Sequence, residues 1–139
     1  MELPQVETSE WLSHLKQYQR SSLSILIDMH GEEEAAKLWL AANGPKDTQK
    51  FGGNGNVQPF WDRFVAELRL FICGDKKYNK ERKELLQQAK GATALLVSVI
   101  SGAIGASLGF SASLLAPAVA LMLHVIGKVG ANAWCNTQQ

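Results

Sequence analysis

Hydrophobic and polar positions divide the chain into two parts. Through the first 90 residues, apolar side chains recur at intervals of three and four between charged ones, as in amphipathic helices. Residues 91–127 differ, because they contain no Asp, Glu, Lys or Arg. The pattern predicts an all-α fold, with a small amphipathic helical bundle over residues 1–90 and a hydrophobic, Gly- and Ala-rich helical hairpin over residues 91–139.

Four or five helices are expected in the N-terminal part, over residues 8–20, 22–30, 32–42, 59–73 and 76–90. Gly44 and Pro45 end the third of these helices. Residues 45–58 contain several glycines among polar residues and predict a loop. Gly74 suits the end of the fourth helix, and Asp75 can cap the fifth.

The apolar segment is long enough for two helices. A break at Gly109 leaves 17 residues for the first helix, 92–108, and 20 for the second, 112–131. A bilayer core requires roughly 20 residues, with a range of about 17–25. The first helix is therefore at the short end of this range, and the second fits it. The segment is a candidate for a membrane-embedded hairpin.

Small residues recur every three or four positions along both hairpin helices, so each helix has a face without bulky side chains. Such faces let helix backbones approach closely, and inside lipid they replace hydrophobic burial in helix association. Because Gly in a helix interior costs about 1 kcal/mol in water, its repeated use indicates a need for close contact. The residues predicted to pack the hairpin are Ser98, Gly102, Gly105, Gly109, Ala116, Ala120 and Gly127.

Basic residues flank the predicted hairpin on both sides. Positive charge favours the cytoplasmic side of a membrane, and a hairpin returns the chain to the side that it left. We therefore expect a protein of the inner membrane with both termini in the cytoplasm; the alternative is a cytoplasmic protein. The membrane-flanking basic residues are Lys76, Lys77, Lys80, Arg82, Lys83, Lys90 and Lys128.

Overall charge and the two cysteines limit the classes of function. A formal net charge of +1 argues against a nucleic-acid-binding protein, which would carry a strongly basic face. Early acidic residues, and no apolar stretch before Leu23, argue against a secretory signal. Cys73 and Cys135 are too few for a disulfide framework or a zinc site, and we interpret them as free thiols in a reducing compartment. An antiparallel hairpin would also be able to bring them together, because they bracket the apolar region.

No residue pattern indicates catalysis, so we do not expect an enzyme, a metal site or a cofactor. His14, His30 and His124 are isolated from one another in sequence, and no two histidines have the i, i+4 spacing that would suggest a metal site. His124 is a candidate titratable group, because an ionisable side chain in an apolar helix is costly and often functional. A hydrogen-bonded structural histidine is the alternative. The acidic run of residues 32–34 is interpreted as a solvated helix start.

Two functions are consistent with these features. The first is a membrane-active protein, in which the bundle senses a signal or binds an unidentified protein, and the hairpin oligomerises to permeabilise or remodel a membrane. In its apolar, Gly- and Ala-rich character alone, the hairpin resembles the hydrophobic hairpins of pore-forming colicins and the two-helix membrane modules of small bacterial immunity effectors. The resemblance implies an effector in bacterial defence or competition. The second function is a soluble interaction module, with the hairpin as its core or oligomer interface and its contacts on the 59–73 and 76–90 helices.

Overall fold

The computed structural model describes residues 3–43, 58–88 and 92–137, and every regular element within these ranges is helical. This confirms the all-α prediction. The predicted loop at residues 45–58 lies almost wholly outside the described residues, as does Lys90. The elements are α1 (Thr8–Leu12), α2 (Gln17–His30), α3 (Glu32–Asn43), α4 (Gln58–Cys73), the 3₁₀ turn η2 (Lys76–Tyr78), α5 (Asn79–Gln88), α6 (Thr93–Leu108), α7 (Ala112–Val129) and α8 (Ala131–Thr137).

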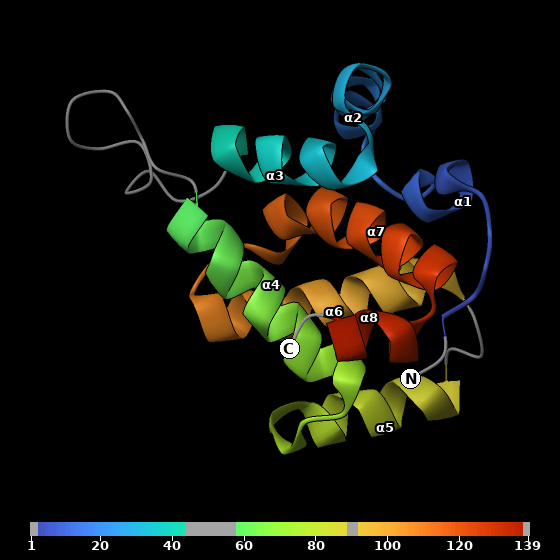
Figure 1. Cartoon of the computed structure of the whole chain (residues 1–139), viewed down its shortest axis with the longest axis vertical. Coiled ribbons are helices and arrows are strands. Elements are labelled where there is room, and N and C mark those ends of the chain that lie inside the picture. Colours follow the sequence, from blue (N-terminus) through green and yellow to red (C-terminus); the bar gives the residue numbers. More distant parts are fainter. Residues whose placement is uncertain (1–2, 44–57, 89–91, 138–139) are drawn as a thin grey trace.

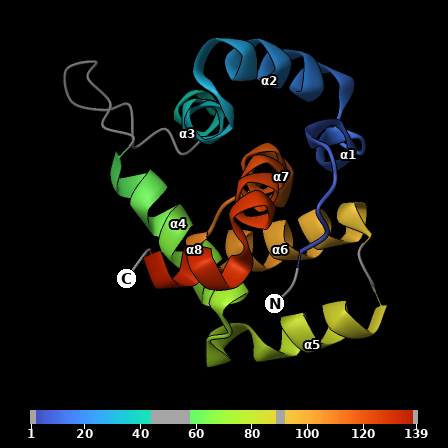
Figure 2. The same cartoon turned by 45° about the vertical axis from the view of Figure 1, so that its right-hand side comes forward.

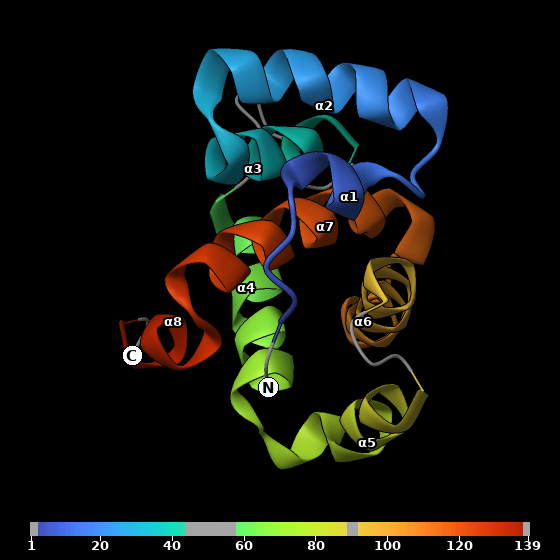
Figure 3. The same cartoon turned by 90° about the vertical axis from the view of Figure 1, so that its right-hand side faces the viewer.

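Helix α7 is the central element of the fold. It contacts α1 and α3 on one side and α6 on another, and α8 follows it (Figure 1). Helix α2 lies outside α3, and α5 lies at the opposite end of the molecule against α6 (Figure 3). Of the 18 residues of α7, 11 are buried, as expected for a helix that is hydrophobic on all sides.

The buried side chains of both parts of the chain form one hydrophobic cluster. From the N-terminal part, Trp39 and Phe64 are buried, and from the hairpin Ile100, Leu115 and Leu121 are buried with them. The apolar face predicted for the 59–73 helix therefore packs inside the molecule. The hairpin supplies the other side of the same core.

The N-terminal helix boundaries differ from the prediction of helices over 8–20 and 22–30. The chain leaves helical geometry between Leu12 and Gln17, and α2 then runs without interruption to His30 (Figure 2). The Ser13 hydroxyl donates to a backbone carbonyl one turn earlier, at 2.7 Å. The Lys16 backbone N–H donates to the Gln19 side chain at 3.1 Å, which supports the start of α2. These local hydrogen bonds compete with a continuous helix.

The α6–α7 hairpin begins and turns close to the predicted positions. Helix α6 ends before Gly109, whose φ of 70° is in the left-handed region that favours glycine. The Phe110 N–H donates to the Gly105 carbonyl at 2.9 Å and closes the turn. Helix α7 ends earlier than predicted, at Gly130 with φ 99°. Residues 131–137 form the separate helix α8.

Candidate functional site

A polar cluster ties the N-terminal helices to α7. The Glu32 carboxylate, at the start of α3, accepts a hydrogen bond from the Thr8 hydroxyl at 2.9 Å. The same carboxylate contacts Nδ1 of His124, and Lys128 Nζ lies 3.3 Å from its other oxygen. The side chains of Glu32 and His124 are 15% and 10% exposed. One carboxylate thus joins α1, α3 and α7.

The cluster corrects the interpretation of Glu32 as a solvated residue. Glu33 and Glu34 are exposed, but Glu32 faces α7 because α3 packs along it. A carboxylate at a helix N-terminus is also favoured by the helix dipole. His124 obtains from this fold the acidic partner that its own helix lacks, across 92 positions of sequence. A buried polar group requires such a partner. His14 and His30, by contrast, are exposed.

The geometry of Thr8 favours a structural tie over catalysis. A nucleophile–His–acid triad requires the hydroxyl on the lone pair of one ring nitrogen while the acid holds the other. The Thr8 oxygen lies 3.3 Å from Nδ1 and 3.5 Å from Nε2 of His124, so it is nearly equidistant from both and on neither lone-pair axis. Among the described residues, no group of three His, Cys, Asp or Glu side chains has an arrangement suited to a metal ion.

The segment before α1 covers this cluster. A cavity of about 430 Å³ lies between residues 4–8 and the polar cluster. The Gln5 side-chain amide donates to the Gly127 carbonyl at 3.3 Å. A Cβ on Gly127 would lie 3.5 Å from the Pro4 carbonyl oxygen. Gly127, expected within the hairpin packing, thus contacts the N-terminal segment.

The other small residues of the hairpin occupy different surroundings. Gly105 is buried at the turn, where an added Cβ would lie 2.7 Å from the Phe110 carbonyl oxygen. Gly109 ends α6, Ala116 is half-buried and Ala120 is buried. Ser98 and Gly102 are exposed, and an added Cβ on Gly102 would meet open space. Close backbone approach within the chain therefore occurs at Gly105.

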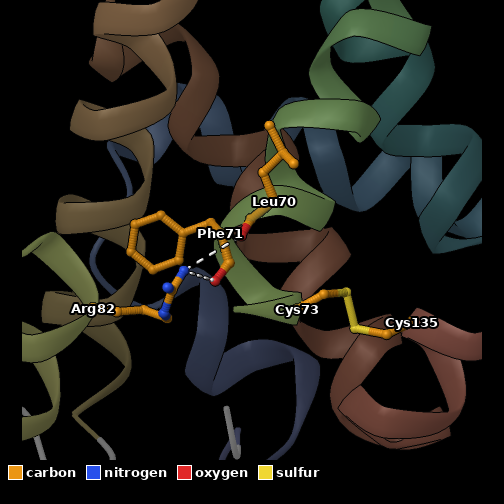
Figure 4. The surroundings of a disulfide bond; sticks show 5 residues. All are labelled: Leu70, Phe71, Cys73, Arg82 and Cys135. Carbon is orange, nitrogen blue, oxygen red and sulfur yellow. Dashed lines mark hydrogen bonds between the residues drawn. A yellow bond between two sulfur atoms is a disulfide. The ribbon is translucent and has the colours of Figure 1, made fainter. Parts of the chain in front are cut away.

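Arg82 does not belong with the predicted membrane-flanking basic residues. It is 8% exposed, and its guanidinium donates to the carbonyls of Leu70 at 3.3 Å and Phe71 at 2.9 Å (Figure 4). It also donates to the Asp75 carbonyl at 2.7 Å. Arg82 thus satisfies carbonyls at the C-terminal end of α4, where a cation is favoured. The side chains of Lys76, Lys77, Lys80, Lys83 and Lys128 are exposed.

The turn after α4 carries a second polar network. Tyr78 Oη donates to Glu67 at 2.5 Å and lies 2.7 Å from the Ser107 hydroxyl, and Lys77 Nζ lies 2.8 Å from Glu67. Burial, with the hydrogen bond to Glu67, raises the pKa of Tyr78 to about 12. Burial alone would raise the pKa of Glu67, but hydrogen bonds from Lys77 and Tyr78 outweigh it, and the pKa is lowered.

Cys73 and Cys135 form a disulfide, so their interpretation as free thiols was wrong. Their Cα atoms lie 5.8 Å apart, and the bond joins the end of α4 to α8 (Figure 4). Two cysteines 62 positions apart carry no recognisable spacing motif. They meet because α8 turns away from α7 and packs against α4.

Only α7, among the described helices, is long and apolar enough to cross a membrane. Helix α6 is apolar but has 16 residues, which is just below the range of about 17–25 for a span. A buried core helix of a soluble protein can have the same length and composition as α7.

Comparisons with protein-family models, curated proteins and solved structures find no significant match, so the function is argued from the geometry of this chain.

Proposed function

We propose that this chain is a small membrane-active protein that shelters its apolar α6–α7 hairpin in the folded form and inserts it into a bilayer when the N-terminal helices separate from it. One observation carries the proposal: the helix best suited to cross a membrane is also the centre of the bundle. Membrane insertion would replace the protein surroundings of α7 with lipid, which is equally apolar.

The attachment of the N-terminal helices supports a separable cover. Helices α1 and α3 lie directly on α7, and α2 lies over α3. Near the C-terminal end of α7 this cover is tied by the contacts of Glu32 with Thr8, His124 and Lys128. Water can replace such hydrogen bonds once the helices part, so each contributes only about 0.5–1.5 kcal/mol net, or somewhat more where charged. The apolar contact beneath them is the larger barrier, and a lipid surface would compensate its loss.

Self-association is the second part of the proposal. Ser98 and Gly102 are exposed on α6, as is Ala106 one turn further on. After insertion, this face would allow close packing with the hairpin of another copy. Permeabilising or remodelling a membrane in this way is the action of an effector, and bacterial defence or competition is the setting that the resemblance to the hairpins of colicins and small immunity effectors implies.

The disulfide bears on the side from which the membrane is met. Disulfides form and persist in oxidising compartments, and they are rare in the cytosol. The Cys73–Cys135 bond therefore supports folding outside a reducing cytoplasm. This part of the proposal replaces the expectation of cytoplasmic termini, which rested on the flanking positive charge.

A dye-release assay with the full chain tests the proposal. Vesicles of phosphatidylglycerol and phosphatidylethanolamine hold a self-quenched dye, and release is compared for the wild type and Glu32→Gln. Loss of the carboxylate charge weakens the tie to His124 and Lys128, so release should be several-fold faster. The matched control is Glu33→Gln, an exposed neighbour on the same helix, which should behave as the wild type. Carbonate extraction then separates inserted from adsorbed protein.

Two results would contradict the proposal. In one, the wild type and Glu32→Gln both leave the vesicles intact and are fully removed by carbonate. In the other, Glu33→Gln accelerates release as much as Glu32→Gln, which would make the effect one of net charge and not of the polar cluster.

One observation favours a soluble interaction module as the alternative. Helix α2 buries only Gln19 and Leu23, while Tyr18, Ile25 and Met29 are 55%, 61% and 69% exposed. This helix would then supply a contact with a protein partner, beside the contacts proposed on the surfaces of the 59–73 and 76–90 helices. Ile25→Glu should in that case abolish partner binding and leave the behaviour with vesicles unchanged.

A further inference from the structure

A groove lies where the end of α1 meets the beginnings of α6 and α7. Its volume is about 340 Å³, within the range of about 300–1,000 Å³ typical of small-molecule sites. Its walls are mostly apolar or small side chains, none of its lining residues is Asp, Glu, Lys or Arg, and the exposed His14 is the one titratable residue that lines it. The lining includes Trp11, Leu15, Val97, Ser101, Ala112 and Ala116.

Two of the lining residues have buried polar atoms that lack partners. Trp11 is 2% exposed and Ser101 is 1% exposed. Within the described part of the chain, neither the Trp11 indole N–H nor the Ser101 hydroxyl has a hydrogen-bond partner. Trp39, in contrast, donates its indole N–H to the Leu114 carbonyl at 2.8 Å. Buried polar groups are nearly always paired, because an unpaired one has lost its hydrogen bonds to water without replacement. Two such groups beside one groove indicate a missing partner.

We propose that this groove binds a neutral, medium-chain aliphatic alcohol or a molecule of that chemistry. The Trp11 indole can only donate, so the ligand must bring an oxygen that accepts. The Ser101 hydroxyl can donate or accept, so a ligand hydroxyl can pair with both groups at once. The apolar walls suit an aliphatic chain, and a lining whose one titratable residue is the exposed His14 offers an ionic head group no buried partner of opposite charge.

Binding requires a local change at both groups. The Trp11 indole N–H and the Ser101 hydroxyl are both closed to solvent in the unliganded form, so each must turn toward the groove. A serine side chain has three staggered positions about a single bond, so the rotation leaves the helix backbone unchanged. The site stands independently of the proposed membrane activity, because it requires only the folded chain.

Nuclear magnetic resonance of the ¹⁵N-labelled full chain, titrated with 1-octanol, tests the site. The chain has 4 Trp residues, and Trp11→Phe identifies the Trp11 indole signal. The expected result is a saturable shift of that signal, with the other indole signals unmoved. Ser101→Ala, which preserves the volume of the site, should weaken octanol binding by roughly 5–10-fold.

A matched pair of variants checks that the groove itself is occupied. Ala94 lines the groove, whereas Ala106 is exposed on the same helix and does not. Ala94→Leu should abolish the shift, and Ala106→Leu should retain it. The proposal is wrong if the wild type shows no saturable shift up to the solubility of octanol. It is equally wrong if Ser101→Ala and Ala94→Leu both bind octanol as tightly as the wild type.

Discussion

Two helix–turn–helix units of this protein, α4–η2–α5 (called the first hairpin) and α6–α7 (called the second hairpin), are held together by different kinds of interaction. In the α4–η2–α5 hairpin, Arg82 binds the carbonyls at the end of α4, and Glu67 contacts Lys77 and Tyr78. In the α6–α7 hairpin, the close fit of Gly105 against the Phe110 carbonyl shapes the turn, and the helices pack through apolar side chains. The first hairpin depends on directional polar bonds and the second on shape.

This difference indicates which hairpin can exchange its surroundings. Hydrogen bonds and ion pairs fix partners at defined distances, and leaving them unmade in lipid is expensive. Apolar packing has no such directionality, so a hairpin whose one Asp, Glu, Lys or Arg residue is Lys128, at its C-terminal end, can keep its own turn while its outer neighbours change from protein to lipid. The disulfide restrains the exchange, because it joins the end of α4, in the first hairpin, to α8, which follows the second.

Removing the disulfide should have the largest effect on the pairing of the two hairpins. The bond joins residues 62 positions apart, and closing a loop of that length contributes about 4 kcal/mol to stability. The double variant Cys73→Ser, Cys135→Ser should lose about that much in guanidinium unfolding. Dithiothreitol should lower the wild-type midpoint and leave the variant unchanged. Equal midpoints with and without reductant would show that the bond does not stabilise the fold.

Arg82 tests whether directional bonds hold the first hairpin. Arg82→Gln leaves carbonyls at the end of α4 without their charged donor, and we expect a loss of about 3 kcal/mol. Its neighbour Lys83 is exposed, so Lys83→Gln should change stability by less than about 0.5 kcal/mol. Urea unfolding measures both. Similar losses in the two variants would mean that helix charge, and not the bonds of Arg82, is what matters.

Two glycines on one helix test the role of shape in the second hairpin. Gly105→Ala places a Cβ about 2.7 Å from a backbone oxygen, so overpacking should cost about 1–3 kcal/mol. Gly102→Ala meets open space and should instead stabilise α6, by up to about 1 kcal/mol. Thermal unfolding followed by circular dichroism compares them. If both variants shift the midpoint in the same direction, the turn is not shaped by the fit of Gly105.

The smallest effect is expected from titrating the polar network of the first hairpin. The pKa of Tyr78 is raised to about 12, so its contribution to stability is complete below its ordinary pKa of 10 and is lost as the pH rises toward 12. The pKa of Glu67 is lowered, so its contribution is present above 4.5 and is lost as the pH falls through the lowered value.

Tyrosinate absorbance measured against pH checks this prediction. The part of the tyrosinate absorbance that appears at the highest pH should be missing in Tyr78→Phe. In Glu67→Gln it should move to lower pH, because contact with the Glu67 carboxylate helps to raise the pKa of Tyr78. An unchanged titration in Glu67→Gln would assign the shift to burial alone.

Sequence patterns located the helices well where a local feature determined the boundary. Gly109 ends α6, Gly74 follows α4 with φ 95°, and the Asp75 carboxylate accepts from the Lys77 N–H at 2.9 Å. The predicted helix over 8–20 was wrong, because apolar spacing continues through the turn between α1 and α2. The Ser13 and Gln19 side chains bond to the backbone in and beside that turn, and the spacing of apolar residues does not reveal such bonds.

The candidate sites were only partly visible in the sequence. His124 was conspicuous, as an ionisable residue in an apolar helix, but its partner Glu32 was hidden in an acidic run that resembles any helix start. The groove beside Trp11 and Ser101 had no sequence signature, because its lining combines residues from three helices.

By itself, the sequence determined that the chain is helical, that residues 91–127 are charge-free, and that a hairpin turns at Gly109. These properties depend on side chains that are neighbours along the chain or along one helix. Tertiary structure alone decided that α7 lies at the centre, that Glu32 meets His124, that Arg82 binds the end of α4, and that Cys73 meets Cys135. Those pairings depend on how helices distant in sequence pack, and apolar burial drives that packing without encoding which partners meet.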